Sequence, residues 1–174
     1  MGVIALVNEK GGVGKSTVSV HLAAYLQREL DISIALVDCD PQQGSSMWID
    51  ASDQIDVTTY TASGDDVTKV IKQADRDHDV VVVDGPAGLA DESFQIVLTA
   101  DVLLIPVGMS LLELTATART VQVVQEARGI IESKGGTPPE AYILLNRVRK
   151  GTHLASELRD AASSLELPVL STQT

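Results

Sequence analysis

The chain has 174 residues, of which 44% are apolar and 21% charged, as is typical of a single folded domain. Aromatic residues make up only 3%, too few for a platform that stacks the bases of single-stranded nucleic acid. A net charge of −11 argues against a broad basic surface for DNA, although a small basic patch could still form where two chains meet.

The chain has one cysteine, Cys39, which excludes an internal disulfide. No apolar run approaches the ~18 residues of a membrane span, and no charged-then-apolar leader follows Met1. We therefore expect a cytoplasmic protein with no membrane span.

Short apolar runs alternate with helical patterns along the chain. Each run is apolar on both faces, as in strands that helices cover from both sides, and the runs are 3–7, 32–37, 80–83, 102–107 and 142–145, with a weaker one at 57–61. Helical patterns begin near Lys15 and cover residues 65–74, 111–133 and 154–165. This alternation predicts one α/β domain over residues 1–174, with a doubly wound, mostly parallel sheet and helices on both faces.

The loop after the first expected strand has the sequence N-E-K-G-G-V-G-K-S-T, from Asn8 to Thr17. Its glycines let backbone N–H groups converge on an anion, the following helix adds its positive end, and Lys15 adds a full charge. The Ser16 hydroxyl is placed to bind Mg²⁺ on the β and γ phosphates. The ordinary phosphate loop has Gly where this chain has Glu9, so the sequence fits the variant K-G-G-x-G-K-[S/T] instead. The predicted nucleotide-binding residues of the loop are Lys10, Gly11, Gly12, Val13, Gly14, Lys15, Ser16 and Thr17.

The loop also carries a second lysine, Lys10. Lys15 alone can reach its own nucleotide, so Lys10 is free to point elsewhere. If two chains face each other across their nucleotides, Lys10 can contact the partner's phosphates, much as an arginine finger does. The alternative is a solvated loop charge.

Carboxylates follow two of the expected strands, and the carboxyl ends of parallel strands open onto one crevice. Asp84 comes after four valines, which matches a metal-holding position of phosphate-loop proteins, and residues 85–88 are typical of a loop that senses the γ-phosphate. Asp38 is the candidate to orient or deprotonate the attacking water, and Asp40 to support the metal shell or the switch loop. The alternative for each is an aspartate that only starts a turn.

The base-reading position favours adenine. After the strand 142–145 the chain has N-R-V-R, without the aspartate of the guanine-reading N-K-x-D loop. The Asn146 amide carries a donor and an acceptor that suit an adenine edge. We therefore expect ATP, with Asn146 as a plain turn residue the alternative.

Taken together, these motifs resemble the ParA/MinD family of deviant-Walker P-loop ATPases. The resemblance rests on the phosphate loop, Asp38, the Asp84-Gly85-Pro86 loop, Ile105-Pro106-Val107 and Leu144-Leu145-Asn146-Arg147, and it covers nearly the whole chain. It is strongest to the short ParA type, which includes ParF-like and McdA carboxysome-positioning proteins.

The resemblance implies a Mg²⁺-dependent ATPase that forms a homodimer with ATP. In that state it would bind double-stranded DNA nonspecifically, on the nucleoid, and a ParB- or McdB-like cargo adaptor would stimulate hydrolysis. The cargo would be a plasmid, a chromosome or a carboxysome. Among the candidate residues, Lys10 would act across the dimer, Lys15, Ser16 and Thr17 would bind the phosphates and Mg²⁺, Asp38 would handle the water, Asp84 the metal and Asn146 the adenine.

Two features depart from the family pattern. Short ParA proteins continue past the equivalent of residues 172–174, so the resemblance implies that this chain is truncated at its C-terminal end. The acidic net charge leaves few candidates for DNA contacts, and these are Arg119, Arg128, Arg147, Arg149, Lys150 and Arg159.

Three other functions share the loop type. A MinD-like membrane ATPase needs a basic amphipathic C-terminal helix, and residues 165–174 contain no Lys or Arg. An ATPase related to nitrogenase reductase needs more than one cysteine per chain to hold its cluster. A ligase of the dethiobiotin-synthetase kind needs a further substrate pocket, of which the sequence gives no sign.

Overall fold

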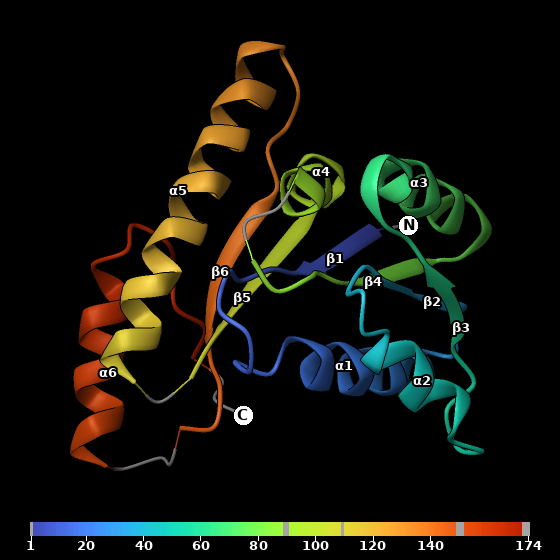
Figure 1. The fold of residues 1–174 in the computed structure, drawn as a ribbon, viewed down its shortest axis with the longest axis horizontal. Helices are drawn as coiled ribbons and strands as arrows, with labels where there is room; N and C mark the ends of the chain where they lie inside the picture. The colour runs from blue at the N-terminus through green and yellow to red at the C-terminus, as the bar shows by residue number, and fades with distance from the viewer. Residues whose placement is uncertain (1, 89–90, 109, 149–151, 172–174) are drawn as a thin grey trace.

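The computed structural model describes residues 2–88, 91–108, 110–148 and 152–171 (Figure 1). Within them lies one six-stranded sheet in the order β3-β2-β4-β1-β5-β6, and every pairing in it is parallel. The strands are β1 (Gly2–Leu6), β2 (Ile34–Asp38), β3 (Thr58–Thr61), β4 (Val80–Asp84), β5 (Val102–Val107) and β6 (Glu140–Leu145). The expected parallel α/β sheet is therefore confirmed, including the weak strand that became β3.

The helices connect successive strands in the usual way of this fold class. They are α1 (Lys15–Leu30), α2 (Gly44–Asp50), the 3₁₀ turn η1 (Gly64–Asp66), α3 (Val67–Asp77), α4 (Asp91–Thr99), α5 (Leu111–Ser133) and α6 (His153–Ser163). The four helices expected from the sequence are present, whereas α2 and α4 were not expected. Both are short, with 7 and 9 residues, so neither repeats an apolar stripe for long enough to be recognised.

Helices cover both faces of the sheet, as the apolar strands require. On one face, α3, α4, α5 and α6 pack on alternate strand residues such as Val81, Leu103 and Ile143. On the other face, α1 and α2 pack on Leu6, Leu36 and their neighbours (Figure 1). Successive side chains of a strand point to opposite faces of the sheet. Because helices cover both faces, both sets of side chains of the central strands are buried, which explains why these strands are apolar throughout.

The register of the central strands gathers the predicted site residues at one edge. Asp38, the last residue of β2, is paired with Asp84, the last residue of β4. Leu6, the last residue of β1, is paired with the same Asp84. The loop that follows β1 therefore starts beside both carboxylates, as the sequence predicted.

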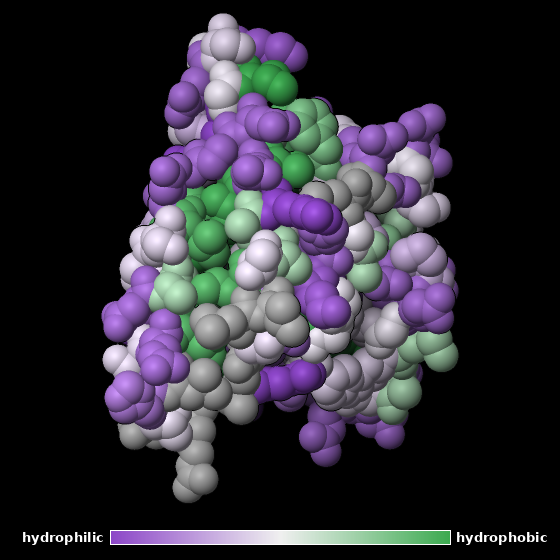
Figure 2. Space-filling view, turned by 60° about the vertical axis from the view of Figure 1, so that its left-hand side comes forward, coloured by the Kyte–Doolittle hydropathy of each residue, from purple (hydrophilic) through white to green (hydrophobic). Residues whose placement is uncertain are grey.

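Some apolar surface remains uncovered. On the α1 face, a hollow of about 630 Å³ runs beside β5 and β6, with Leu22, Leu104, Leu144 and Leu170 in its lining. Figure 2, which brings the side of the molecule near α5 and α6 forward, shows a strip of hydrophobic side chains bordered by hydrophilic ones. Apolar surface that stays open in this way is typical of proteins that associate with other molecules.

No helix in the described part of the chain is long and apolar enough to cross a membrane.

We predict that Gly85→Ala destabilises the protein by roughly 1–3 kcal/mol, because inserted atoms in a tight site force shifts of the backbone. A Cβ on Gly85 would lie 2.5 Å from the Leu6 carbonyl oxygen, to which Gly85 N already donates a hydrogen bond of 3.0 Å. The matched control is Gly129→Ala, because nothing lies within 4 Å of a Cβ added there in α5. It should stabilise the helix by about 0.5–1 kcal/mol. Urea unfolding of both variants checks the prediction, and equal midpoints would contradict it.

Candidate nucleotide-binding site

The loop between β1 and α1 forms an open cradle. Gly12 and Gly14 adopt left-handed backbone angles, with φ of 78° and 97°, a region that suits glycine. A Cβ on Gly14 would also collide with the Asn146 amide nitrogen, so this glycine is required twice over. The cradle encloses a hollow of about 200 Å³, lined by Gly11, Gly12, Gly14, Lys15, Ser16, Thr17, Asp40, Ala87 and Arg147. Six predicted loop residues and Asp40 thus meet in one place, while the predicted Val13 is buried beneath the loop.

Lys15 is the first residue of α1, and its side chain is only 6% exposed. Its Nζ donates to the carbonyl oxygens of Asn8, at 3.1 Å, and Lys10, at 3.3 Å. Burial lowers the pKa of this ammonium group, and the charges of Asp84 and Asp40 oppose that change. The cation is therefore held inside the loop, where phosphate oxygens would complete its coordination.

Lys10 lies differently. It is exposed, and only its backbone is tied down, since Lys10 N donates to Asn8 Oδ1 at 3.0 Å. Its ammonium group forms no ion pair within the described residues. The two lysines of the loop therefore differ as expected, with Lys15 turned inward and Lys10 at the surface.

Asn8 is a supporting residue that the sequence did not single out. Its Nδ2 donates to the Pro106 carbonyl at 2.7 Å and to Thr117 Oγ1 at 3.1 Å, so it ties the loop to β5 and α5. A second tie joins Glu9 N to Thr120 Oγ1 at 3.0 Å. The signal that could have found this role is a polar residue at the end of an apolar strand, where an unpaired buried amide would be costly.

Asp84 is fully buried behind the loop. Its Oδ1 accepts a hydrogen bond from Ser19 Oγ at 3.3 Å, while its Oδ2 has no hydrogen-bond partner among the residues that the structure describes. Burial raises the pKa of Asp84 to about 6, and the Ser16 and Ser45 hydroxyls offset part of the increase. A buried carboxylate oxygen without a hydrogen-bond partner, in a carboxyl group whose pKa the nearby Ser16 hydroxyl lowers, fits a divalent cation, which would supply the missing partner.

That cation would need ligands from outside the protein. No group of three or more His, Cys, Asp or Glu side chains placed to hold a metal occurs in the described ranges. The residues present therefore suit Mg²⁺ bound jointly by Ser16, the Asp84 carboxylate, directly or through water, and phosphate oxygens. The other predicted metal residue, Asp40, lines the cradle and is half-buried. Its Oδ1 accepts a hydrogen bond from Gln42 N at 2.9 Å, so part of this carboxylate is engaged in the turn that follows β2.

The carboxylate of Asp38 accepts three hydrogen bonds. Its Oδ2 accepts from Ser46 N at 3.0 Å and Ser46 Oγ at 3.1 Å, and its Oδ1 accepts from Asp40 N at 3.0 Å. These bonds attach the first turn of α2 to the end of β2. Asp38 thus has a structural task in addition to the catalytic one that we expect of it, and α2 depends on this tertiary contact.

Asn146 lies directly under the loop. It is buried, and its Nδ2 donates to the Val13 carbonyl at 2.7 Å. The following residue, Arg147, returns to the same loop, where its Nη1 donates to the Gly12 carbonyl at 3.1 Å. The β6 end therefore adjoins the phosphate cradle, and adenine binding by Asn146 stays a prediction.

The other DNA candidates are mostly engaged within the chain. Arg119 pairs with Glu9 at 3.3 Å, Arg159 donates to the Leu170 carbonyl at 3.3 Å, and Arg128 is half-buried. Arg149 and Lys150 lie outside the described residues.

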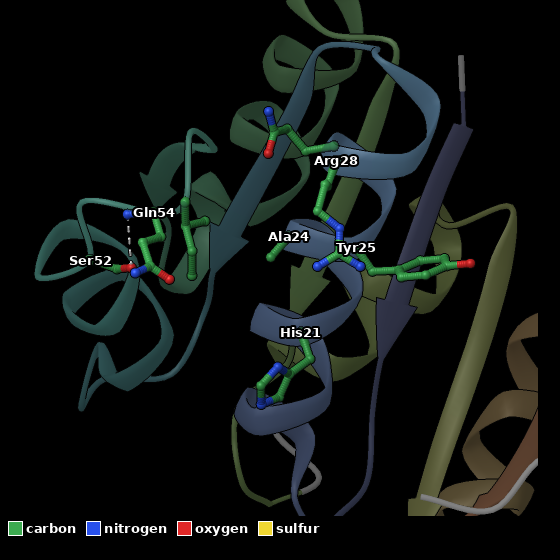
Figure 3. Close-up of a pocket in the computed structure, with 8 residues that line it drawn as sticks. His21, Ala24, Tyr25, Arg28, Ser52 and Gln54 are labelled. Carbon is green, nitrogen blue, oxygen red and sulfur yellow. Dashed lines mark hydrogen bonds between the residues drawn. The ribbon is translucent and has the colours of Figure 1, made fainter.

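A further hollow, of about 510 Å³, has no residue of the phosphate loop in its lining (Figure 3). It lies between α1, which contributes His21, Tyr25 and Arg28 to its lining, and the segment after α2, which contributes Ser52 and Gln54. It contains none of the predicted site residues, whereas another hollow, of about 520 Å³, has Asp38 and Asp40 in its lining.

Comparison with known sequences gives concordant relatives. The chain is 32% identical to the maintenance of carboxysome distribution protein A of Halothiobacillus neapolitanus, over 97% of this chain and 77% of that protein. It is 30% identical to protein ParA of Rhizobium radiobacter, over 77% of this chain but only 61% of that protein. The chain therefore spans between three fifths and four fifths of the length of these relatives.

Solved structures share the fold. Apo McdA of Cyanothece superposes with a TM-score of 0.78 at 16% identity, covering 99% of this chain and 85% of that one. Cobyrinic acid a,c-diamide synthase of Mycobacterium smegmatis, with a bound ATP analog and magnesium, gives 0.79 at 22% identity, covering 99% and 84%. The family model described as the CobQ/CobB/MinD/ParA nucleotide binding domain matches residues 4–173. With its lysine-bearing cradle and its two strand-end carboxylates, the chain belongs to the CobQ/CobB/MinD/ParA family of nucleotide-binding domains.

Proposed function

We propose that this chain is a Mg²⁺-dependent ATPase of the ParA type, which dimerises with ATP and positions a cargo. The observation that carries the proposal is the contrast between the two loop lysines. Lys15 is buried at the cradle, whereas Lys10 is exposed and unpaired within the described residues. A second copy facing the cradle would bring its own Lys10 to the phosphates, where it would stabilise charge in the transition state.

The hydrolysis roles follow from the strand ends. Mg²⁺ supplies charge neutralisation on the phosphates when it is bound. Lys15 would hold the β and γ phosphates, Ser16 and Asp84 would orient the cation, and Asp38 would orient the attacking water. Asn146 would contribute the adenine contact from the end of β6.

The positioning role is supported by relatives of two kinds. Both the carboxysome distribution protein and the ParA protein are more than a quarter identical to this chain. By analogy, we propose that the ATP-bound dimer binds double-stranded DNA nonspecifically, on the nucleoid, and that a ParB- or McdB-like adaptor stimulates hydrolysis. The fold alone does not separate this role from that of a biosynthetic synthase, because a synthase shares it.

The DNA role is tested by binding of a random-sequence duplex to the full-length protein at one stated salt concentration, with ATP and with ADP. Binding with ATP alone is the expected result. Equal binding in both states, or none in either, would remove DNA as the surface on which the dimer moves. The salt concentration must be held fixed because phosphate contacts weaken steeply with it.

We predict that Lys15→Ala abolishes measurable ATP binding, because the cradle loses the buried cation that would hold the phosphates. Lys10→Ala is the matched comparison, since it removes the same charge from the same loop at an exposed position. It should retain the affinity of the single chain for ATP and lose dimer-dependent turnover. Calorimetric titration and phosphate release check both variants. Undiminished ATP affinity in the Lys15 variant would refute its phosphate role, and normal turnover in the Lys10 variant would make it a surface charge.

We predict that Asp38→Ala binds ATP and stays dimeric, with hydrolysis reduced at least about a hundredfold, since general-base groups contribute 10²–10⁴-fold. Size-exclusion chromatography with ATP and a phosphate-release assay measure the two properties. Because Asp38 also anchors α2, circular dichroism should accompany them. A folded variant that hydrolyses ATP at the wild-type rate would show that Asp38 does not orient the water.

We predict a pH-dependent stability difference between the nucleotide-free wild type and Asp84→Asn. The pKa of Asp84 is raised from 3.8 to about 6, so the folded chain holds this proton more tightly than the unfolded chain does. The corresponding stability is complete below about pH 4 and is lost as the pH rises to about 6, on the order of 3 kcal/mol in all. Between about pH 4 and pH 6 the free energy of unfolding of the variant should therefore rise relative to that of the wild type, as measured by urea unfolding without Mg²⁺. A difference that stays constant from pH 4 to 7 would contradict the buried, proton-binding carboxylate.

A further inference from the structure

Arg147 has an unusual backbone conformation. It follows Asn146 at the end of β6, and its φ of 59° places it in the left-handed region. Residues other than Gly, Asn and Asp rarely adopt this backbone conformation, and those that do are often found at functional sites. Here the turn sends the arginine side chain back to a loop 135 residues earlier in the chain, where Nη1 meets the Gly12 carbonyl at 3.1 Å.

The guanidinium stands at the mouth of the phosphate cradle. It lines the same hollow as Lys15, Ser16 and Thr17, and its Nη2 lies 4.0 Å from the Cβ position of Gly14. It also lines an adjoining hollow of about 320 Å³ that contains Glu113. Yet it forms no ion pair with Glu113, Asp40 or any other carboxylate of the described ranges. An exposed, unpaired cation thus overlies the very glycines whose N–H groups would face an anion.

We propose that Arg147 binds the α and β phosphates of the nucleotide, as a second cation opposite Lys15. This inference rests on the proposed ATP-binding function and adds to it a residue outside the phosphate loop. In such loops the glycine N–H groups surround the α and β phosphates, whereas the lysine reaches the β and γ phosphates. Arg147 lies over Gly12 and Gly14, on the glycine side of the cradle. Its planar fork suits paired phosphate oxygens, and the bond to Gly12 holds the fork in place.

This placement reassigns a residue that the sequence offered for DNA. A guanidinium anchored on the loop's own carbonyl is positioned to contact the nucleotide of the same chain. Because ADP and ATP share the α and β phosphates, the contact should contribute to both affinities equally. It differs in this from Lys10, whose proposed contact forms only in the ATP-bound dimer.

The test is calorimetric titration of the full-length protein with Mg²⁺-ADP and with Mg²⁺-ATP. Arg147→Ala should bind both nucleotides roughly tenfold to a hundredfold more weakly, as expected for the loss of a charged hydrogen bond. Arg147→Lys keeps the charge without the planar fork, so its affinity for each nucleotide should lie between those of the wild type and Arg147→Ala. Arg28→Ala is the matched control, since Arg28 is exposed on α1 and pairs only with its neighbour Glu29.

The outcomes separate this inference from the function on which it rests. If the wild type binds ADP and Arg147→Ala binds it within twofold of the wild type, the inference is wrong and the ATPase proposal stands. A loss confined to ATP would also overturn it, by placing the contact on the γ-phosphate or across the dimer. If the wild type binds neither nucleotide, both proposals fail. Arg147→Gly, which suits a φ of 59°, provides a well-folded variant that should lose the same affinity.

Discussion

The side chain of Asn8 holds the phosphate loop open, and the rest of the site depends on it. Its amide nitrogen is fixed by Pro106 on β5 and Thr117 on α5, and its oxygen accepts the Lys10 N–H. Its own carbonyl accepts the Lys15 ammonium. A single buried residue thereby sets the start of the loop and the position of its buried cation. Because the Asn8 amide is satisfied on both sides, the loop is shaped before any anion arrives, which reduces the ordering cost of binding.

The carboxylates of the site have unequal environments, and their proposed roles differ accordingly. Three hydrogen bonds, from Ser46 and from the backbone of Asp40, fix the Asp38 carboxylate, and its Oδ1 can still accept another. Asp84 has an oxygen with no partner and a pKa raised to about 6 by burial. A group with an unmet hydrogen-bonding need suits a metal ion, because the ion removes the cost of burying the charge. A group held in place by three hydrogen bonds suits the orientation of a water molecule.

The bonds of Asp38 also connect the site to a distant surface. They attach the first turn of α2, whose Met47 and Trp48 are 65% and 43% exposed. The edge of the Trp48 ring packs against His21 of α1, with 5.5 Å between ring centroids. Asp38, which would orient the attacking water, is thus hydrogen-bonded to Ser46, and Ser46 precedes the exposed Trp48 by two residues in α2. A substitution of Asp38 would therefore remove two hydrogen bonds to Ser46 in the first turn of α2.

The sequence by itself determined the sheet, because strands buried on both faces must be apolar throughout, and such apolar runs can be recognised in a single sequence. It also determined the cradle, since the glycines and lysines between Lys10 and Thr17 are adjacent in the chain and their chemistry is local. It placed Asp38 and Asp84 correctly at one edge, as strand ends of a parallel sheet always meet there. Tertiary structure alone decided the rest. The carboxylate of Asp38 accepts the Ser46 N–H in the first turn of α2, a bond that no apolar stripe of so short a helix announces. Asn8 donates to Thr117 and Arg147 donates to the Gly12 carbonyl, and no local pattern encodes these two contacts, because the partners are 109 and 135 residues apart.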